Sequence, residues 1–450
     1  MNIVAHFPLF HTLFKNGKVI IVNPIQSLFH LTANSSAQNH SLPFFRKGQL
    51  FHGKVIKLLP NDFALLEIGG TRLNAKLEVG LSAGRRYWFQ VEQNEPFPRL
   101  KMIPVEGAEK TPANRSTEVL LKQIGLPPTA SNKALVSFFA KEGLPFSKAF
   151  LQKASPWLAN RDVAESLLVI KTIITRQFPI QTDVFQALSS LIKPKPLAVQ
   201  LQQLSNVLTT ISKQTQPVQQ LKASLATVLQ TITIPIDENG SAIPFPLRQM
   251  IHQLGFSYEN ALFRALKGNA LAKDVDALVK TLKPSLLAVL GEDIPVHVKE
   301  MVQETIHRLT GQQLLFAGED PLQQLFFQLP FSIGGRPSDV FIQYQGKKKN
   351  GTVDADYCRV LFYLELESLK ETVIDVHIQN RMMTIRIYNE NKQLEQIAKP
   401  LQSVLKERLN DLDYHLASIQ WVDLDAKQGR PSPIQSIDWM VSYQGVDMKI

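Results

Sequence analysis

The sequence is poor in features on which several common kinds of protein depend. Its single cysteine, Cys358, excludes an internal disulfide and a cysteine-based zinc cluster. Because Cys358 alternates with apolar Val360 and Phe362, we expect a packed, unreactive thiol. No apolar run approaches the roughly 20 residues that a membrane-spanning helix needs. The N-terminus lacks a secretory cleavage pattern, so we expect a cytoplasmic chain without membrane insertion.

Long runs of like charge are also missing, although the formal net charge is +10. Residues 320–450 hold 15 Lys and Arg against 17 Asp and Glu, which leaves the basic excess to residues 1–319. The densest basic tract is Lys347-Lys348-Lys349. A solvated surface explains this excess most simply, and attraction to nucleic acid or an acidic partner is the alternative.

Catalytic signatures are absent as well. The sequence contains no nucleophile elbow, phosphate-binding loop or zinc-protease motif. His297 and His307 have no carboxylate at metal-ligand spacing, and no glycine at the calcium-loop position follows the acid pair Asp411/Asp413. We therefore expect no enzyme activity, no metal and no cofactor.

What is present indicates a folded protein of several domains. With 44% hydrophobic and 20% charged residues, a chain of 450 residues has the composition of about two to four globular domains. The predicted fold class is multi-domain α+β: an N-terminal small β-barrel, a central all-α region and a C-terminal α+β module of antiparallel strands with one packed helix. The predicted boundaries are a loosely ordered 1–42, a barrel at 43–104, a helical region at 115–316 and a C-terminal domain at 320–450.

The barrel is predicted from short strands around a two-glycine turn. Gly69-Gly70 suits the tip of a hairpin, which places Glu67 opposite Arg72. Five short strands in this region are typical of an OB-like or SH3-like barrel. A structural or protein-docking barrel is the default interpretation, and nucleic-acid binding is the alternative. The residues available for nucleic acid are Lys54, Lys57, Arg72, Lys76, Arg85 and Arg86, with Tyr87 and Trp88 as stacking platforms.

The C-terminal module contains a hairpin whose register follows from its pattern. With Asn380-Arg381 as the tip, Val376 faces Ile385 and Ile374 faces Ile387, while Asp375 faces Arg386 on the opposite side. The following helix carries a leucine-rich stripe that should cover the aliphatic side of the hairpin. This stripe consists of Leu394, Ile397, Leu401, Leu405 and Leu409.

This module resembles the C-terminal domain of flagellar hook-length control proteins over residues 357–425, and a non-secreted relative of that family fits as well. The residues that carry the resemblance are predicted core: Leu364 and Leu366, Val376 and Ile378, Ile385 and Ile387, then Leu401, Leu405 and Leu409.

The resemblance implies an interaction protein. Its C-terminal domain would dock onto the switch protein of a type III export gate, or onto a relative of that protein's cytoplasmic domain. It also leaves open export through a flagellar type III apparatus. Nucleic-acid binding by the basic barrel and the helical middle is the alternative function. The outward-facing residues predicted to contact a partner are Glu365, Asp375, His377 and Arg386.

Overall fold

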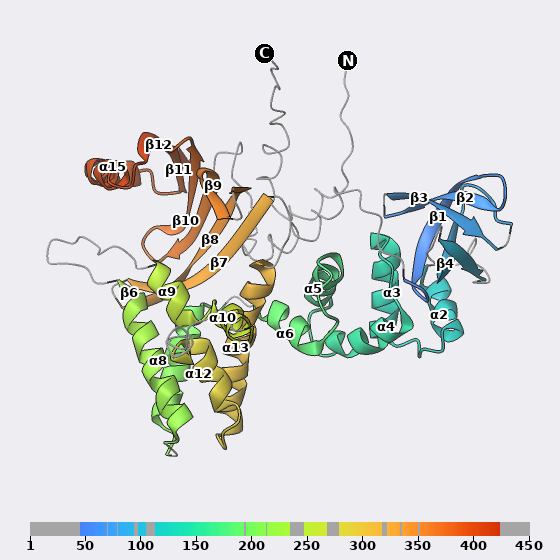
Figure 1. The fold of residues 1–450 in the computed structure, drawn as a ribbon, viewed down its shortest axis with the longest axis horizontal. Coiled ribbons are helices and arrows are strands. Elements are labelled where there is room, and N and C mark those ends of the chain that lie inside the picture. Colours follow the sequence, from blue (N-terminus) through green and yellow to red (C-terminus); the bar gives the residue numbers. More distant parts are fainter. Residues whose placement is uncertain are drawn as a thin grey trace, which may run out of the picture. The chain divides into compact units, whose positions relative to one another are not determined.

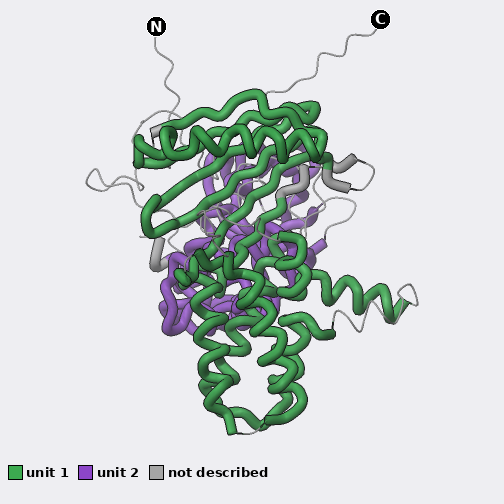
Figure 2. Tube along the Cα trace, turned by 90° about the vertical axis from the view of Figure 1, so that its left-hand side faces the viewer, with its two compact units in different colours: residues 1–28, 190–450 green, residues 29–189 purple. Residues whose placement is uncertain are grey.

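The computed structural model describes residues 46–423 except 70, 79, 94–97, 105–112, 193–194, 213, 235–246, 268–278, 317–321, 334 and 350–351. The chain divides into two compact units, residues 29–189 and residues 1–28 with 190–450 (Figure 2). The boundary at residue 190 therefore falls inside the predicted helical region rather than at its end. The predicted loosely ordered segment 1–42 and the end of the C-terminal domain lie outside the described residues.

Unit 29–189 begins with the predicted barrel. Its five strands close in the order β1-β2-β3-β5-β4 (Figure 1). Glu67 pairs with Arg72 across the β2–β3 hairpin, as predicted. Alternate side chains from all five strands fill the interior, with Phe51, Leu66 and Phe89 fully enclosed. The strands are β1 Leu50–Leu58, β2 Phe63–Ile68, β3 Thr71–Leu77, β4 Arg86–Gln93 and β5 Arg99–Ile103.

Helices follow the barrel and are joined to it within the same unit. Phe146 forms a backbone bridge to Leu50 of β1, and its ring packs edge-on against Trp88 of β4. Gly69 at the hairpin tip touches Gly143, which ends α3 in a left-handed conformation. The helices are α2 Ala113–Gln123, α3 Ala130–Glu142, α4 Lys148–Ala154, the 3₁₀ turn η2 Ser155–Leu158, α5 Val163–Thr175 and α6 Thr182–Ser190.

The second unit combines helices with a large sheet. Its helical part consists of α7 Leu197–Thr209, α8 Gln216–Ile232, α9 Leu247–Leu254, α10 Tyr258–Leu266, α12 Leu282–Val289 and α13 Val296–Phe316. These helices share one apolar core with strand residues such as Leu329 and Ile342. Helices after residue 190 therefore belong to the same unit as the C-terminal sheet. None of the helices in the described ranges is long and apolar enough to cross a membrane.

The sheet has seven strands in the order β12-β11-β10-β9-β8-β7-β6. All neighbours are antiparallel except the end pairs β11–β12 and β6–β7, which are parallel. The strands are β6 Thr233–Ile234, β7 Leu322–Ile333, β8 Arg336–Lys349, β9 Thr352–Leu366, β10 Lys370–Gln379, β11 Met382–Asn389 and β12 His415–Asp423. Between β11 and β12 the chain forms α14 Leu394–Ala398, the 3₁₀ turn η3 Lys399–Leu401 and α15 Gln402–Asn410.

Candidate functional site

The hairpin of β10 and β11 has the predicted register. Ile374 lies opposite Ile387, Val376 opposite Ile385 and Asp375 opposite Arg386. The tip residues Asn380 and Arg381 both have positive φ, as a two-residue hairpin of this type requires. The alternation of aliphatic and polar residues was therefore sufficient to fix which side chains share a face.

The polar side of this hairpin contains an enclosed ion pair. Arg359 of β9 donates from Nε and Nη2 to the two carboxylate oxygens of Asp375, each at 2.8 Å. His377 Nε2 lies 3.2 Å from Asp375 Oδ2. Burial by itself raises the pKa of Asp375, but the hydrogen bonds from His377 and Arg359 outweigh it and lower that pKa. Asp375 is thus held as a carboxylate by its neighbours.

The predicted partner-contact residues are only partly on the surface. Asp375 is 1% exposed, so the prediction that it faces a partner is wrong. The burial of Asp375 could not be read from the hairpin sequence, because the residue that neutralises and covers its carboxylate, Arg359, lies on a different strand. Glu365 is exposed, while His377 and Arg386 are half-buried. Arg386 donates from Nε to Gln420 Oε1 rather than pairing with Asp375.

The predicted core residues divide into two groups. Val376, Ile378 and Ile385 are buried, and Ile387 packs against them. Leu364 and Leu366 are partly buried and pack against the core shared with the helices. Leu409 is the helix residue that reaches the hairpin core.

Most of the helical stripe faces outward, which corrects the prediction that Leu401 and Leu405 are core. Ile397 and Leu401 are 63% and 62% exposed. Leu409 packs against the hairpin core, while Leu405 and Leu401, one and two turns earlier on the same face, are exposed. We call the exposed set the outer stripe: Ile397, Leu401, Val404, Leu405 and Leu412. Five large apolar side chains are thus exposed on one short segment, and grouped exposed apolar side chains are typical of interaction sites.

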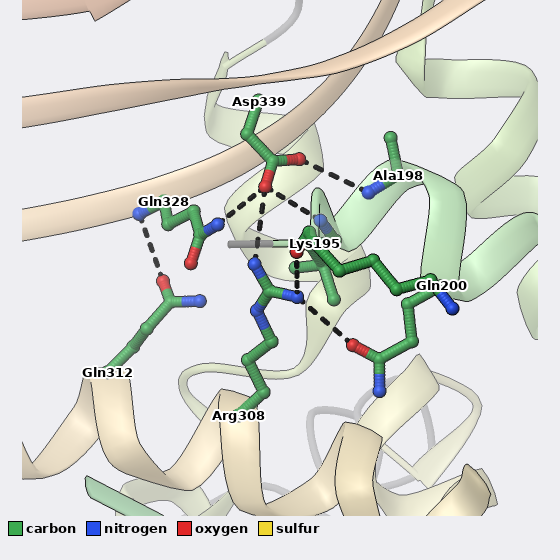
Figure 3. Close-up of polar contacts among 8 residues, drawn as sticks. Lys195, Ala198, Gln200, Arg308, Gln312, Gln328 and Asp339 are labelled. Carbon is green, nitrogen blue, oxygen red and sulfur yellow. Dashed lines mark hydrogen bonds and ion pairs between the residues drawn. The ribbon is translucent and has the colours of Figure 1, made fainter. Parts of the chain in front are cut away.

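A second polar cluster lies where the helices meet β7 and β8 (Figure 3). Asp339 of β8 accepts hydrogen bonds from the backbone N–H groups of Leu197 and Ala198 at 2.7 and 3.2 Å. Pro196 gives α7 no side-chain cap, so this distant carboxylate takes that role. Arg308 of α13 lies 3.4 Å from Asp339, and Gln328 of β7 also donates to it.

This cluster is organised to hold the unit together. Arg308 Nη1 also donates to the Lys195 carbonyl at 2.6 Å and to Gln200 Oε1 at 3.2 Å. Burial raises the pKa of Asp339, while Arg308 and the backbone donors oppose that rise. Because four donors already point at the carboxylate, we assign it as ionised and fully engaged. Asp339 is also buried, so this carboxylate is not open to a ligand from solvent. No signal in the sequence linked these distant positions.

The surface of the barrel carries a basic row across neighbouring strands. Lys54 of β1 pairs with Arg86 of β4 on one side and with Glu67 of β2 on the other, and Glu67 pairs with Arg72 of β3. Side chains paired in this way share one face of the sheet, and Arg72 and Arg86 are exposed. Trp88 is only 6% exposed.

The predicted stacking role of Trp88 is therefore wrong, because Phe146, in the segment between α3 and α4, packs against its ring. Trp88 packs against His52 and Phe146. The enclosure also lowers the pKa of His52 to about 4, mainly by burial and further through Arg86. Tyr87 is half-buried and packs edge-on against Phe89.

Features that would indicate chemistry are weak in the part of the chain that the structure describes. Within it, no group of three or more His, Cys, Asp or Glu side chains is placed to hold a metal. Cys358 is buried, and burial raises the pKa of its thiol to about 11, which agrees with the expected unreactive thiol. A shallow hollow lies at the ends of β11 and β12. It is lined by Ile387, Asn389, Asn391, Lys392, Glu395, Trp421 and Val422.

Comparison with known proteins identifies the barrel region. Residues 24–101 match the family described as the TP0910 S1-like domain. The whole chain is similar to a Bacillus subtilis (strain 168) protein titled "Uncharacterized protein YlqG", with 21% identity covering 95% of this chain and 98% of the relative. No solved structure matches the chain.

Proposed function

We propose that this protein is an interaction protein whose C-terminal module docks onto a protein partner through the outer stripe. The observation that carries the proposal is the exposure of Ile397, Leu401, Val404, Leu405 and Leu412 on one segment. Burying such side chains against a partner contributes roughly 1.5–3 kcal/mol each in favourable cases. An amphipathic helix laid against an apolar groove is a recurrent form of recognition.

The partner we favour is the cytoplasmic domain of a type III export-gate switch protein, or a stand-alone relative of that domain. This choice rests on the resemblance of residues 357–425 to hook-length control proteins. The hairpin core of Val376, Ile378 and Ile385, which carries part of that resemblance, is buried. The encounter would take place in the cytoplasm, where that domain lies.

A pull-down with the full chain tests this proposal. The double substitution Leu401→Asp/Val404→Asp changes exposed side chains, so folding should be retained while the apolar patch is lost. We expect capture of the candidate partner to fall at least tenfold, because two charged groups would have to be desolvated at the interface. Gln396→Asp/Ser403→Asp is the matched control, since both residues are exposed on another side of the same segment. Equal capture by both variants would contradict the proposal.

Nucleic-acid binding by the barrel is a second candidate function. Two observations favour it: the S1-like family match and the row Arg86, Lys54, Glu67 and Arg72 across four neighbouring strands, which holds three basic side chains and one acidic one. Small five-stranded barrels of the OB type bind oligonucleotides across a strand face. The burial of Trp88 removes one expected stacking platform, so this binding would rely on charge and depend strongly on salt.

A further inference from the structure

Helix α10 has an open apolar side. Leu262, Phe263 and Leu266 are 37%, 57% and 80% exposed. At 3.6 residues per turn, these three positions lie within an arc of roughly 100°. Among the described residues, α10 has only weak contacts with other helices and strands, and none of its own residues is buried. Because a helix of nine residues is marginally stable in water by itself, we expect its apolar arc to be covered when the protein works.

The first turn of α10 is anchored by a polar cluster. Glu259 pairs with Lys283, whose side chain is 3% exposed, and its Oε2 accepts a hydrogen bond from Gln313 Nε2 at 2.7 Å. The same Gln313 nitrogen donates to the Phe256 carbonyl at 2.9 Å. The body of the unit therefore holds the beginning of α10 and neutralises its only acidic side chain, while Leu266 at the other end is its most exposed apolar residue.

The remaining charges around α10 are basic. Residues 247–267 contain one acidic residue, the neutralised Glu259, and three Lys or Arg residues, all of them exposed. Two of these, Arg264 and Lys267, lie on α10 or directly after it, and Lys267 Nζ lies 4.3 Å from the centre of the Phe263 ring. An apolar arc bordered by cations is typical of helices that lie in the interface of an anionic membrane, where the apolar side chains reach the acyl chains and the cations stay at the phosphates.

A protein groove matches this helix less well than a lipid surface does. Three exposed side chains are far fewer than the roughly 20–30 residues that each side of a stable protein interface contributes. Since the contacts of α10 with neighbouring elements are weak, those elements do not extend its apolar surface. A bilayer needs no complementary shape, and each apolar or basic side chain adds to the attraction. The arc and the charges of α10 therefore favour a lipid surface over a second copy of the chain or an acidic protein.

We propose that α10 binds the surface of an anionic lipid membrane, with Leu262, Phe263 and Leu266 inserted at the headgroup boundary and with Arg264 and Lys267 paired with lipid phosphates. The helix does not cross the bilayer, because it is only nine residues long. Binding by one short helix is weak and reversible, so it raises the concentration of the chain near a membrane without fixing it there. The site is separate from the outer stripe, and no protein partner takes part in its test.

Cosedimentation of the full chain with lipid vesicles tests the inference. Vesicles of phosphatidylglycerol mixed with phosphatidylcholine should bind the chain at least tenfold more tightly than phosphatidylcholine alone, and added salt should reduce this difference. Phe263→Ser/Leu266→Ser should weaken binding to the mixed vesicles at least fivefold. Leu287→Ser/Val296→Ser, which changes two exposed apolar side chains elsewhere in the same unit, should leave it unchanged. Equal losses in the two variants, or equal binding to the two kinds of vesicle, would overturn the inference.

Charge reversal separates α10 from the general basicity of the chain. Arg264→Glu/Lys267→Glu and Arg72→Glu/Arg86→Glu change the net charge by the same amount, and the second pair lies in the basic row of the barrel. We expect the first double substitution to weaken vesicle binding at least tenfold and the second to weaken it less than about threefold. Equal effects would show a general attraction of the +10 chain to anionic lipid and would overturn the inference.

A nitrobenzoxadiazole dye attached to an introduced cysteine locates the inserted side of the helix. The native Cys358 is buried, so labelling of Leu266→Cys or Asn260→Cys is selective. We expect the fluorescence of the dye at position 266 to rise when mixed vesicles are added, with a much smaller rise at position 260, which is exposed outside the apolar arc. Equal rises at the two positions would contradict the proposed orientation.

Sedimentation velocity without vesicles tests whether α10 instead joins two copies of the chain. We expect the same mass for the wild type and for Phe263→Ser/Leu266→Ser. A dimer that this double substitution dissociates would overturn the membrane assignment in favour of a second copy. Absence of vesicle binding at low salt would overturn it as well, and neither result would bear on docking through the outer stripe.

Discussion

Arg359 and Asp375 form a two-pronged ion pair between β9 and β10, with both hydrogen bonds at 2.8 Å and both side chains buried. Two parallel bonds fix the orientation of a guanidinium against a carboxylate more strictly than a single bond does. The pair lies between strands whose opposite side holds the aliphatic core of Val376 and Ile378. It therefore fixes the centre of the sheet rather than offering a contact to a partner.

Removing the charge of Asp375 should destabilise the sheet. Asp375→Asn leaves Arg359 buried without its counter-charge, which costs about 3–5 kcal/mol when a buried pair is broken. Because the folded pKa of Asp375 lies below its unfolded value near 3.9, the stabilisation is present above about pH 4 and is lost as the pH falls through the folded pKa. The difference between variant and wild type should be full at pH 7 and shrink below about pH 4.

Native-state hydrogen exchange of peptides from β9 and β10 measures this effect. Glu365→Gln serves as the control, because Glu365 is exposed and its substitution should change the opening free energy by less than about 0.5 kcal/mol. An Asp375 variant no less stable than this control at pH 7 would contradict the assignment.

The Asp339 cluster predicts a strong coupling across the second unit. Asp339→Asn should destabilise α7, α13 and β8 together by about 3–5 kcal/mol, because the substitution leaves Arg308 buried and uncompensated. The double variant Asp339→Asn/Arg308→Met should cost less than the sum of the two single changes. Urea unfolding of the wild type, the two single variants and the double variant gives the four free energies of unfolding for this double-mutant cycle. If the losses of the two single variants add up to that of the double variant, the two side chains act independently.

The contact between Gly69 and Gly143 predicts that the barrel and its helices depend on a close backbone approach. A Cβ at Gly143 would lie 2.3 Å from Gly69, and Gly143 has a φ of +64°. Gly143→Ala should therefore destabilise peptides of β2, β3 and α3 by more than about 2 kcal/mol in hydrogen exchange. Gly84→Ala is the control, because Gly84 has a φ of +85° but open space around its Cβ position. If Gly143→Ala and Gly84→Ala destabilise the protein equally, the positive φ alone, and not the contact with Gly69, accounts for the need for glycine at position 143.

The basic row on the barrel predicts how nucleic acid would bind. Fluorescence anisotropy with a labelled single-stranded oligonucleotide should give an affinity that falls steeply between 50 and 200 mM salt, in line with about three or more neutralised phosphates. Lys54→Ala/Arg72→Ala should weaken binding uniformly across sequences and flatten the salt dependence. Lys148→Ala, outside the row, should change neither. Absence of binding at low salt would remove this second candidate function.

Local alternation in the sequence was enough to predict both hairpins. The pairing of Val376 with Ile385 and of Glu67 with Arg72 follows from the two-residue period of strands and the choice of turn. A one-residue slip would have moved every apolar side chain to the wrong face. The barrel strands and the fold class were predictable for the same reason.

Contacts between distant segments were not predictable. Nothing near Asp339 in the sequence indicates that its carboxylate caps α7, more than 100 residues earlier. Asp375 was taken for a surface residue because its alternation with aliphatic neighbours is the same whether a polar face meets water or Arg359.

The exposure of Leu401 was also missed, for a different reason. The periodicity of the stripe correctly indicates an amphipathic helix, but it does not say how much of the apolar arc the sheet can cover. Leu409 reaches the sheet and Leu401 does not. The excess of apolar surface over what the described sheet covers is the basis of the docking proposal.

Hydrogen exchange of the full chain with and without the partner tests the docking proposal most directly. The probe is the purified cytoplasmic domain of an export-gate switch protein or its stand-alone relative, at a concentration that saturates the wild-type chain. We expect partner-dependent protection over residues 394–412, with no comparable change in barrel peptides, and loss of that protection in Leu401→Asp/Val404→Asp. Saturated binding that leaves residues 394–412 unprotected, or no binding at all, would contradict the proposal.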